Sequence, residues 1–164
     1  MVIVDTSLIY KWLIDEEPKK ITESARKLLR RFLKGKEKIL CPNLILYELG
    51  NILAYKNTFS KAEIDNVWQK FSDINLPLTN PTQEFMKKCI DFSLQYSVSV
   101  YDASYAVLAR EKNCILLTAD SKFVKKINLP FVKLLTHYPL SVKLKESLEK
   151  NKNLYKRVGK DWEN

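Results

Sequence analysis

Glu48 is a carboxylate in an otherwise apolar stretch, ILYELGNILAY, which spans residues 45–55. On a helix, its neighbours one turn away are mostly apolar residues that face a core. A carboxylate in such a place is costly unless another group pairs with it, and no lysine or arginine stands one helical turn from Glu48. We therefore expect its partner to come from outside this helix.

Three aspartates join Glu48 as candidates for one site. Asp5 follows the first apolar run, Asp120 stands two residues after CILLT, and Asp102 opens a predicted helix that leads back into CILLT. Ligands in open α/β sheets bind beyond the carboxyl ends of the strands. If the first strand lies between the second and the fourth, all four carboxylates converge on one edge of the sheet.

Each aspartate also has a purely structural explanation, because all three precede a predicted helix and aspartate is a favoured N-cap. A cap does not explain Glu48, which lies inside its helix. Four carboxylates without a cation would repel one another, and some would have to remain protonated. Mg²⁺ or Mn²⁺ resolves this repulsion, since both ions take oxygen ligands and are usually shared with substrate phosphates. The acids therefore predict a metal site for phosphate chemistry.

Short apolar runs alternate with helical patterns along the chain. The predicted strands are residues 1–4, 38–42, 74–78, 114–118 and 130–135. The predicted helices are residues 7–14, 22–34, 43–55, 60–72, 82–96, 102–111 and 121–127. This alternation predicts a three-layer α/β domain over residues 1–136, in which helices flank a five-stranded parallel sheet. Pro77 suggests that the third strand lies at an edge of the sheet.

Residues 137–164 follow the last predicted strand and form a basic C-terminal extension. Apolar residues line one face of a predicted terminal helix: Leu144, Leu148, Tyr155, Val158 and Trp162. This helix packs on the domain or projects from it toward a second copy, RNA or another partner.

Composition narrows the class of protein. The chain has 164 residues, of which 46% are hydrophobic, so it is long enough to bury a core without disulfides. Three glycines are too few for a glycine-rich phosphate loop, and three separated cysteines in apolar stretches predict buried, reduced thiols. No signal peptide is recognised and no apolar stretch is long enough to cross a membrane, so we expect a soluble, cytoplasmic protein.

The net charge of +9 is concentrated between residues 19 and 38, where nine basic residues stand against two acidic ones. A basic face of this density attracts polyanions. The residues predicted to contact an RNA backbone are Arg26, Lys27, Arg30, Arg31 and Lys34. The alternative is a solvated helix face on a lysine-rich protein.

Four motifs carry a family resemblance: DTS at 5–7, YELGN at 47–51, YDASY at 101–105 and TADSKF at 118–123. In order and spacing they resemble the motifs of PIN-domain ribonucleases, and most of all those of VapC toxins from VapBC toxin–antitoxin systems. The resemblance covers about residues 1–136. It implies a sheet with the first strand central and endonucleolytic cleavage of single-stranded or structured RNA that depends on Mg²⁺ or Mn²⁺.

The resemblance also implies roles for individual residues. The catalytic and metal-binding set becomes Asp5, Glu48, Asp102 and Asp120. The supporting polar groups become Ser7, Asn51 and Thr118. Thr6 either supports the site or caps the first helix. A small antitoxin and a second copy of the chain become the expected protein partners.

Two other functions remain open beside that of a toxin. The first is a non-catalytic PIN-like module that binds RNA or a partner, although the presence of all four acids favours an enzyme. The second is a stand-alone nuclease of RNA processing or decay that has no antitoxin. The C-terminal extension and the basic segment both depart from a minimal VapC, so the substrate stays open. Ribonuclease chemistry by acid–base catalysis alone usually uses a histidine pair, and this chain has only His137.

Overall fold

Strand β1 (Val2–Val4) lies in the middle of a five-stranded parallel sheet with the order β3-β2-β1-β4-β5. The computed structural model describes residues 1–15, 19–55 and 59–139. The other strands are β2 (Ile39–Pro42), β3 (Leu78–Thr79), β4 (Ile115–Thr118) and β5 (Val132–Leu134). The predicted parallel sheet and the central position of its first strand are both confirmed.

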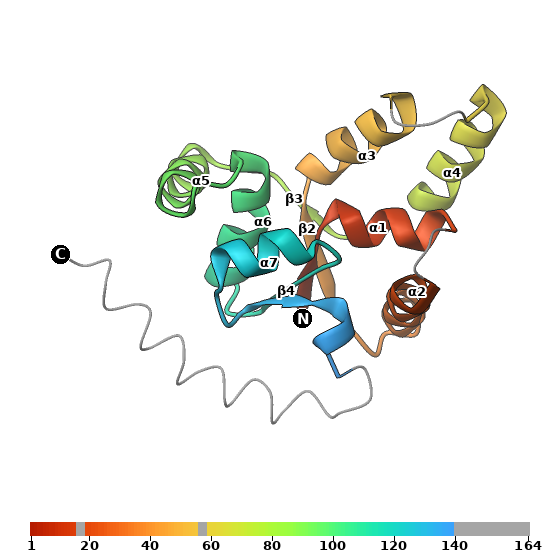
Figure 1. Cartoon of the computed structure of the whole chain (residues 1–164). Coiled ribbons are helices and arrows are strands. Elements are labelled where there is room, and N and C mark those ends of the chain that lie inside the picture. The colour runs from red at the N-terminus through yellow and green to blue at the C-terminus, as the bar shows by residue number, and fades with distance from the viewer. Residues whose placement is uncertain (16–18, 56–58, 140–164) are drawn as a thin grey trace.

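Helices cover both faces of this sheet, as the predicted three-layer fold requires. They are α1 (Thr6–Leu13), α2 (Lys19–Leu33), α3 (Leu44–Tyr55), α4 (Lys61–Asp73), α5 (Gln83–Tyr96), α6 (Val100–Glu111), α7 (Ser121–Ile127) and the 3₁₀ helix η1 (Leu135–His137). In Figure 1, α5 and α6 lie to one side of the strands, and α1 and α2 lie to the other. Helix α6 packs on β1, β2 and β4, and α2 packs on α1 and η1.

The buried core explains why the central strands are apolar at every position. All residues of β1 and β4 are buried, which is typical of parallel strands covered on both faces. Val4 pairs with Leu117, so the two strands end side by side at the same edge of the sheet. Asp5 and Thr118 are therefore neighbours at that edge, which we call the carboxyl edge.

The third strand differs from the prediction of residues 74–78. It contains only Leu78 and Thr79, although it does lie at the edge of the sheet. Two of the residues predicted as strand are not extended. Ile74 is the C-cap of α4 and has helical backbone angles, and Asn75 has a left-handed φ of 49°. Pro77 has no backbone N–H to donate to a neighbouring strand.

Several local predictions are confirmed. Ser60 and Glu63 form the predicted capping box at the start of α4. Gly35 has a φ of 65° just after the end of α2, as expected for a residue that stops a helix. Helix α2 begins at Lys19 among the described residues, three residues earlier than predicted. The three cysteines are buried thiols, as predicted.

The predicted C-terminal helix lies outside the described residues, because the structure describes the chain only as far as residue 139. Within the part of the chain that is described, no helix combines the length and the apolar character needed to cross a membrane.

Candidate active site

Asp5 stands at the carboxyl edge, between the end of β1 and the start of α1. It is the N-cap of α1: its Oδ1 atom accepts hydrogen bonds from the backbone N–H of Leu8 (3.2 Å) and from the hydroxyl of Ser7 (2.6 Å). The cap explanation for Asp5 is thus confirmed. The role of Asp5 as a cap does not account for the pKa of its carboxyl group.

Burial raises the pKa of Asp5 to about 6, from an ordinary value of 3.8. Hydrogen bonds from Ser7, Thr118 and the Leu8 N–H lower this pKa, while the negative charge of Glu48 raises it further. The carboxyl group of Asp5 therefore lies close enough to that of Glu48 to be repelled by it. Among the described residues, neither carboxylate forms an ion pair with lysine or arginine.

Glu48 projects from α3 toward helices α1 and α6. Its Oε2 atom accepts hydrogen bonds from the hydroxyls of Thr6 and Tyr105, the latter at 2.6 Å. Its partners are therefore neutral hydroxyl groups that come from outside α3. Thr6 does not cap α1, because Asp5 holds that position and the Thr6 hydroxyl is turned to Glu48 and Tyr105.

Asp102 belongs to the first turn of α6, and the prediction that it opens this helix is wrong. The helix begins at Val100, and Ser99 is its N-cap, accepting a hydrogen bond from the Asp102 N–H at 3.0 Å. The Ser99 hydroxyl donates in turn to Oδ2 of Asp102 at 2.7 Å. Serine is as good an N-cap as aspartate, which is why composition alone did not choose between them.

Asp120 is the N-cap of α7, so the cap explanation for this aspartate is confirmed. Its Oδ1 atom accepts hydrogen bonds from the backbone N–H groups of Lys122 (2.8 Å) and Phe123 (3.0 Å). Asp120 is exposed at the carboxyl edge, where β4 ends. One of its oxygens is thus committed to the helix.

Ser7 and Thr118 join the ends of the two central strands. Ser7 donates to Asp5 and accepts a hydrogen bond from the Ala119 N–H at 2.9 Å. Thr118 is buried and accepts from the Asp120 N–H at 2.8 Å. Both hydroxyls therefore hold acid-bearing backbone in place. The third predicted polar group, Asn51, is exposed on α3.

The donor set suits a hard divalent cation, although it is not a preformed cage. Within residues 1–15, 19–55 and 59–139, no three His, Cys, Asp or Glu side chains come close enough together to hold a metal ion. Mg²⁺, however, is commonly bound by one or two carboxylates, several waters and substrate phosphates. Asp5 and Glu48 provide such a pair, and the negative charge of Glu48 contributes, after burial, to the raised pKa of Asp5.

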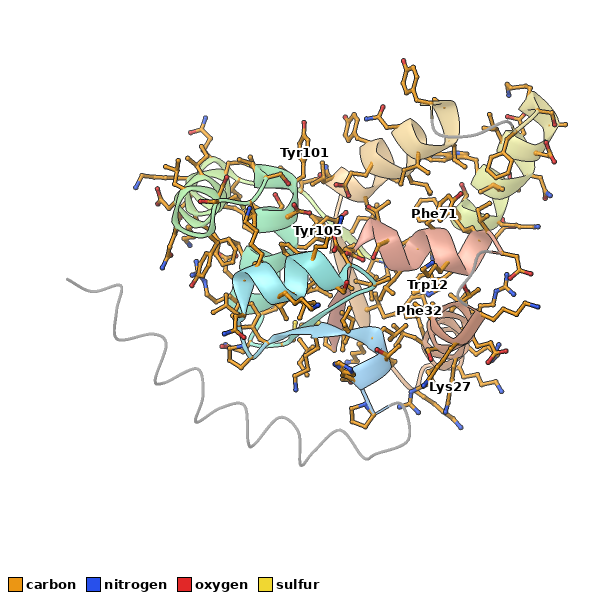
Figure 2. The ribbon with its side chains drawn as sticks, in the orientation of Figure 1. Trp12, Lys27, Phe32, Phe71, Tyr101 and Tyr105 are labelled. Carbon is orange, nitrogen blue, oxygen red and sulfur yellow. The ribbon has the colours of Figure 1, made fainter. Side chains whose placement is uncertain are left out.

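The basic residues of α2 lie away from this carboxylate pair. Helix α2 leads into the start of β2, so its C-terminal end lies at the opposite edge of the sheet from Asp5. Figure 2 shows Lys27 on α2 at the lower right of the molecule, whereas Tyr101 lies at the top and Tyr105 near the middle. Arg31 is partly buried and pairs with the buried Glu37 at 3.9 Å, so it differs from the exposed Lys27.

Tyr105 is the functional candidate that the sequence did not single out. It lies in the YDASY motif, three residues after Asp102, on a helix face that otherwise consists of small and aliphatic residues. A tyrosine buried in such a face needs a partner for its hydroxyl. This requirement could have drawn attention to Tyr105 in the sequence. Its partner could not be identified in that way, because Glu48 is 57 positions away in the chain.

A family model described as the PIN domain matches residues 2–128 of this chain. The fold resembles the crystal structure of PAE2754 from Pyrobaculum aerophilum, with a TM-score of 0.57, 22% sequence identity and coverage of 76% of this chain and 78% of that one. It also resembles a toxin–antitoxin complex from Klebsiella pneumoniae, with a TM-score of 0.60, 13% identity and coverage of 82% and 98%.

No curated protein sequence is a match. At these low identities the two solved structures establish similarity of fold alone. The family model extends from the first strand into the segment after α7, and so includes all four motifs that carry the predicted acids. This chain is a member of the PIN domain family.

Proposed function

We propose that this protein is a divalent-metal-dependent endoribonuclease. PIN domains are generally nucleases, so membership of the family supports a hydrolase of phosphodiester bonds. The observation that carries the proposal is the carboxylate pair of Asp5 and Glu48. These two acids repel each other at the carboxyl edge, and no lysine or arginine of the described residues pairs with either one.

The residues of the site have distinct tasks in this proposal. Asp5 and Glu48 would hold Mg²⁺ or Mn²⁺, and Asp102 and Asp120 each keep one oxygen that is not used by the local helix cap. A cation held there would supply positive charge to the scissile phosphate and would lower the pKa of a bound water molecule. Ser7 and Thr118 keep Asp5 and the end of β4 in register.

Exposed aromatic rings beside the acids support RNA as the substrate. Tyr47 is 73% exposed and immediately precedes Glu48, and Tyr101 is 60% exposed and immediately precedes Asp102. In Figure 2, the ring of Tyr101 points outward from α6, toward solvent. Aromatic faces in such positions stack on unpaired bases, which contributes about 1–3 kcal/mol per base.

The basic segment supplies a second, sequence-independent contact in this proposal. Lys27, Arg30 and Lys34 are exposed, and they carry charges that attract the phosphates of a long RNA whose cleaved part lies at the carboxyl edge. Arg26 is 3.6 Å from Asp15, and Arg31 is paired with Glu37, so we assign these two arginines a smaller share of the binding.

We also propose a small antitoxin as partner and a homodimer as the assembly. The similarity of fold to the toxin–antitoxin complex from Klebsiella pneumoniae supports the antitoxin. Ile90 and Leu94 are exposed one turn apart on α5, which supports an apolar contact with a second copy. Co-purification with the product of the neighbouring gene and inhibition by it would test the antitoxin, and light scattering would test the dimer.

Cleavage of mixed cellular RNA tests the enzymatic function. We expect new RNA ends with Mn²⁺, none with EDTA, and none with Asp5→Asn in either condition. Asp65→Asn is a matched control, because Asp65 is an exposed aspartate that pairs with Lys61 on α4. Loss of cleavage in the control, or equal cleavage by Asp5→Asn, would contradict the role of Asp5. RNA binding without cleavage by the wild type would favour a non-catalytic module.

A further inference from the structure

Three side-chain oxygens from distant parts of the chain, two from hydroxyls and one from a carboxylate, lie close together beside the proposed metal site. The Thr6 hydroxyl on α1 and the Tyr105 hydroxyl on α6 both donate to Oε2 of Glu48 on α3. The two hydroxyl oxygens are 2.9 Å apart. Figure 2 places Tyr105 between α6 and α1, turned into the molecule, whereas Tyr101 on the same helix points outward.

Two hydroxyl protons are available to this group of three oxygens. Each hydroxyl has one proton, so both protons are used when Thr6 and Tyr105 donate to the carboxylate. The Tyr105 hydroxyl is 2.6 Å from Oε2 and acts as a donor to the carboxylate.

Both donors act on the same oxygen of Glu48. Neither hydroxyl contact involves Oε1, so one carboxylate oxygen is held and the other is not used by this pair. Glutamate has a flexible side chain, and fixing it on binding costs conformational entropy. A side chain that is already held by Oε2 avoids most of this cost.

The neutrality of the two donors matters as much as their position. A lysine or arginine at the same place would hold Glu48 equally well, but it would also cancel the charge that attracts a cation. Hydroxyl groups fix the carboxylate and leave its negative charge in place. Groups that bond and orient a metal ligand in this way tune metal affinity in many sites.

We infer that Thr6 and Tyr105 are positioning residues that hold Glu48 by Oε2 and present its other oxygen to a divalent cation. This inference rests on the proposed function, because it needs a cation at Asp5 and Glu48. It extends that function by assigning roles to two hydroxyl groups that act on the metal through Glu48 rather than as ligands themselves.

Binding of Mn²⁺ followed by electron paramagnetic resonance tests the inference without any RNA substrate. We expect Tyr105→Phe and Thr6→Val each to weaken Mn²⁺ binding by about 10-fold or more. Thr6→Ser retains the hydroxyl and should restore binding to near the wild-type affinity. Tyr138→Phe is the control, because Tyr138 is also partly buried near a carboxylate, but that carboxylate is Glu37 at the opposite edge of the sheet.

The outcomes separate this inference from the function on which it rests. If the wild type does not bind Mn²⁺, or if Glu48→Gln binds it as well as the wild type, the metal site itself is overturned. If Glu48→Gln binds weakly but Tyr105→Phe and Thr6→Val bind normally, only the positioning role is overturned. If Tyr105→Phe does not fold, the comparison of Thr6→Val with Thr6→Ser decides the question.

Discussion

Asp5 combines a structural duty with an unfavourable charge. As an N-cap it accepts hydrogen bonds that stabilise α1, yet its burial and the nearby Glu48 both disfavour the ionised form. Asparagine accepts the same capping bonds without a charge and is an equally good N-cap. The substitution of Asp5 by asparagine therefore isolates the electrostatic part of its contribution.

In the absence of divalent metal, Asp5→Asn should be more stable than the wild type at pH 7.5. The folded-state pKa of about 6 lies above the ordinary value of 3.8, so the folded state binds more protons between these values. Wild-type stability should fall as pH rises through this window, by up to about 3 kcal/mol. Asp5→Asn should lack this part of the fall.

Urea denaturation in EDTA at pH 4 and at pH 7.5 measures this effect. The difference between the variant and the wild type should be small at the lower pH and largest at the higher one. Asp65→Asn serves again as the control, because its carboxylate is exposed. A constant difference between Asp5→Asn and the wild type at both pH values would show that the Asp5 carboxyl titrates normally.

Helices α3 and α6 each carry one of the candidate acids. Each presents an exposed tyrosine directly before a candidate acid, and in each the residue directly after that acid, Leu49 or Ala103, is buried. This arrangement follows from helical periodicity, since adjacent residues on a helix point in directions about 100° apart. In the proposed function, each helix therefore uses neighbouring residues for packing, for metal binding and for contact with the substrate.

Tyr101→Ala should weaken the binding of single-stranded RNA by about 1–3 kcal/mol, through the loss of a stacked base. Affinity for Mn²⁺ should not change, because the exposed ring is not a metal ligand. Tyr55→Ala is a suitable control, since Tyr55 is also highly exposed on α3 but lies two turns beyond Glu48. Fluorescence anisotropy with a labelled oligonucleotide measures the change, and an equal loss in both variants would remove Tyr101 from the substrate site.

Helix α2 is the element to which the sequence assigned RNA contact. Reversing Lys27 and Arg30 to glutamate should lower the slope of log affinity against log salt concentration by about 1.4, the value for two contacts with single-stranded RNA. Arg31 is best left intact, because it is the partner of the buried Glu37. A double reversal of the exposed Lys70 and Lys87 changes the net charge equally and should leave the slope nearer that of the wild type.

Divalent metal should stabilise the whole molecule. A ligand that binds only the folded state adds about 2.7 kcal/mol when its concentration is 100 times its dissociation constant. We therefore expect Mn²⁺ or Mg²⁺ to raise the melting temperature of the wild type by several degrees at neutral pH. Differential scanning fluorimetry with metal and with EDTA measures this shift. An equal shift in an Asp5→Asn, Glu48→Gln double variant would place the ion elsewhere.

Local patterns were sufficient for most of the elements. The capping box at Ser60, the stop at Gly35 and the apolar runs of β1 and β4 depend on a few adjacent residues, so their positions were predicted closely. The third strand was misplaced because it has only two residues, which is too short for any alternation to be recognised. The start of α6 was misplaced because Ser99 and Asp102 are both good helix-capping residues.

The amino-acid order alone was enough to identify four candidate acids and to suggest their family. It did not identify what holds Glu48, because Thr6 and Tyr105 are 42 and 57 positions away, and only the packing of α1 and α6 around α3 brings their hydroxyls to one carboxylate oxygen. Nor did it reveal that the basic helix α2 lies away from the carboxylate pair of Asp5 and Glu48. A side chain's type is local, but the charge and hydrogen bonds around it depend on contacts between distant segments, which form only when the chain folds.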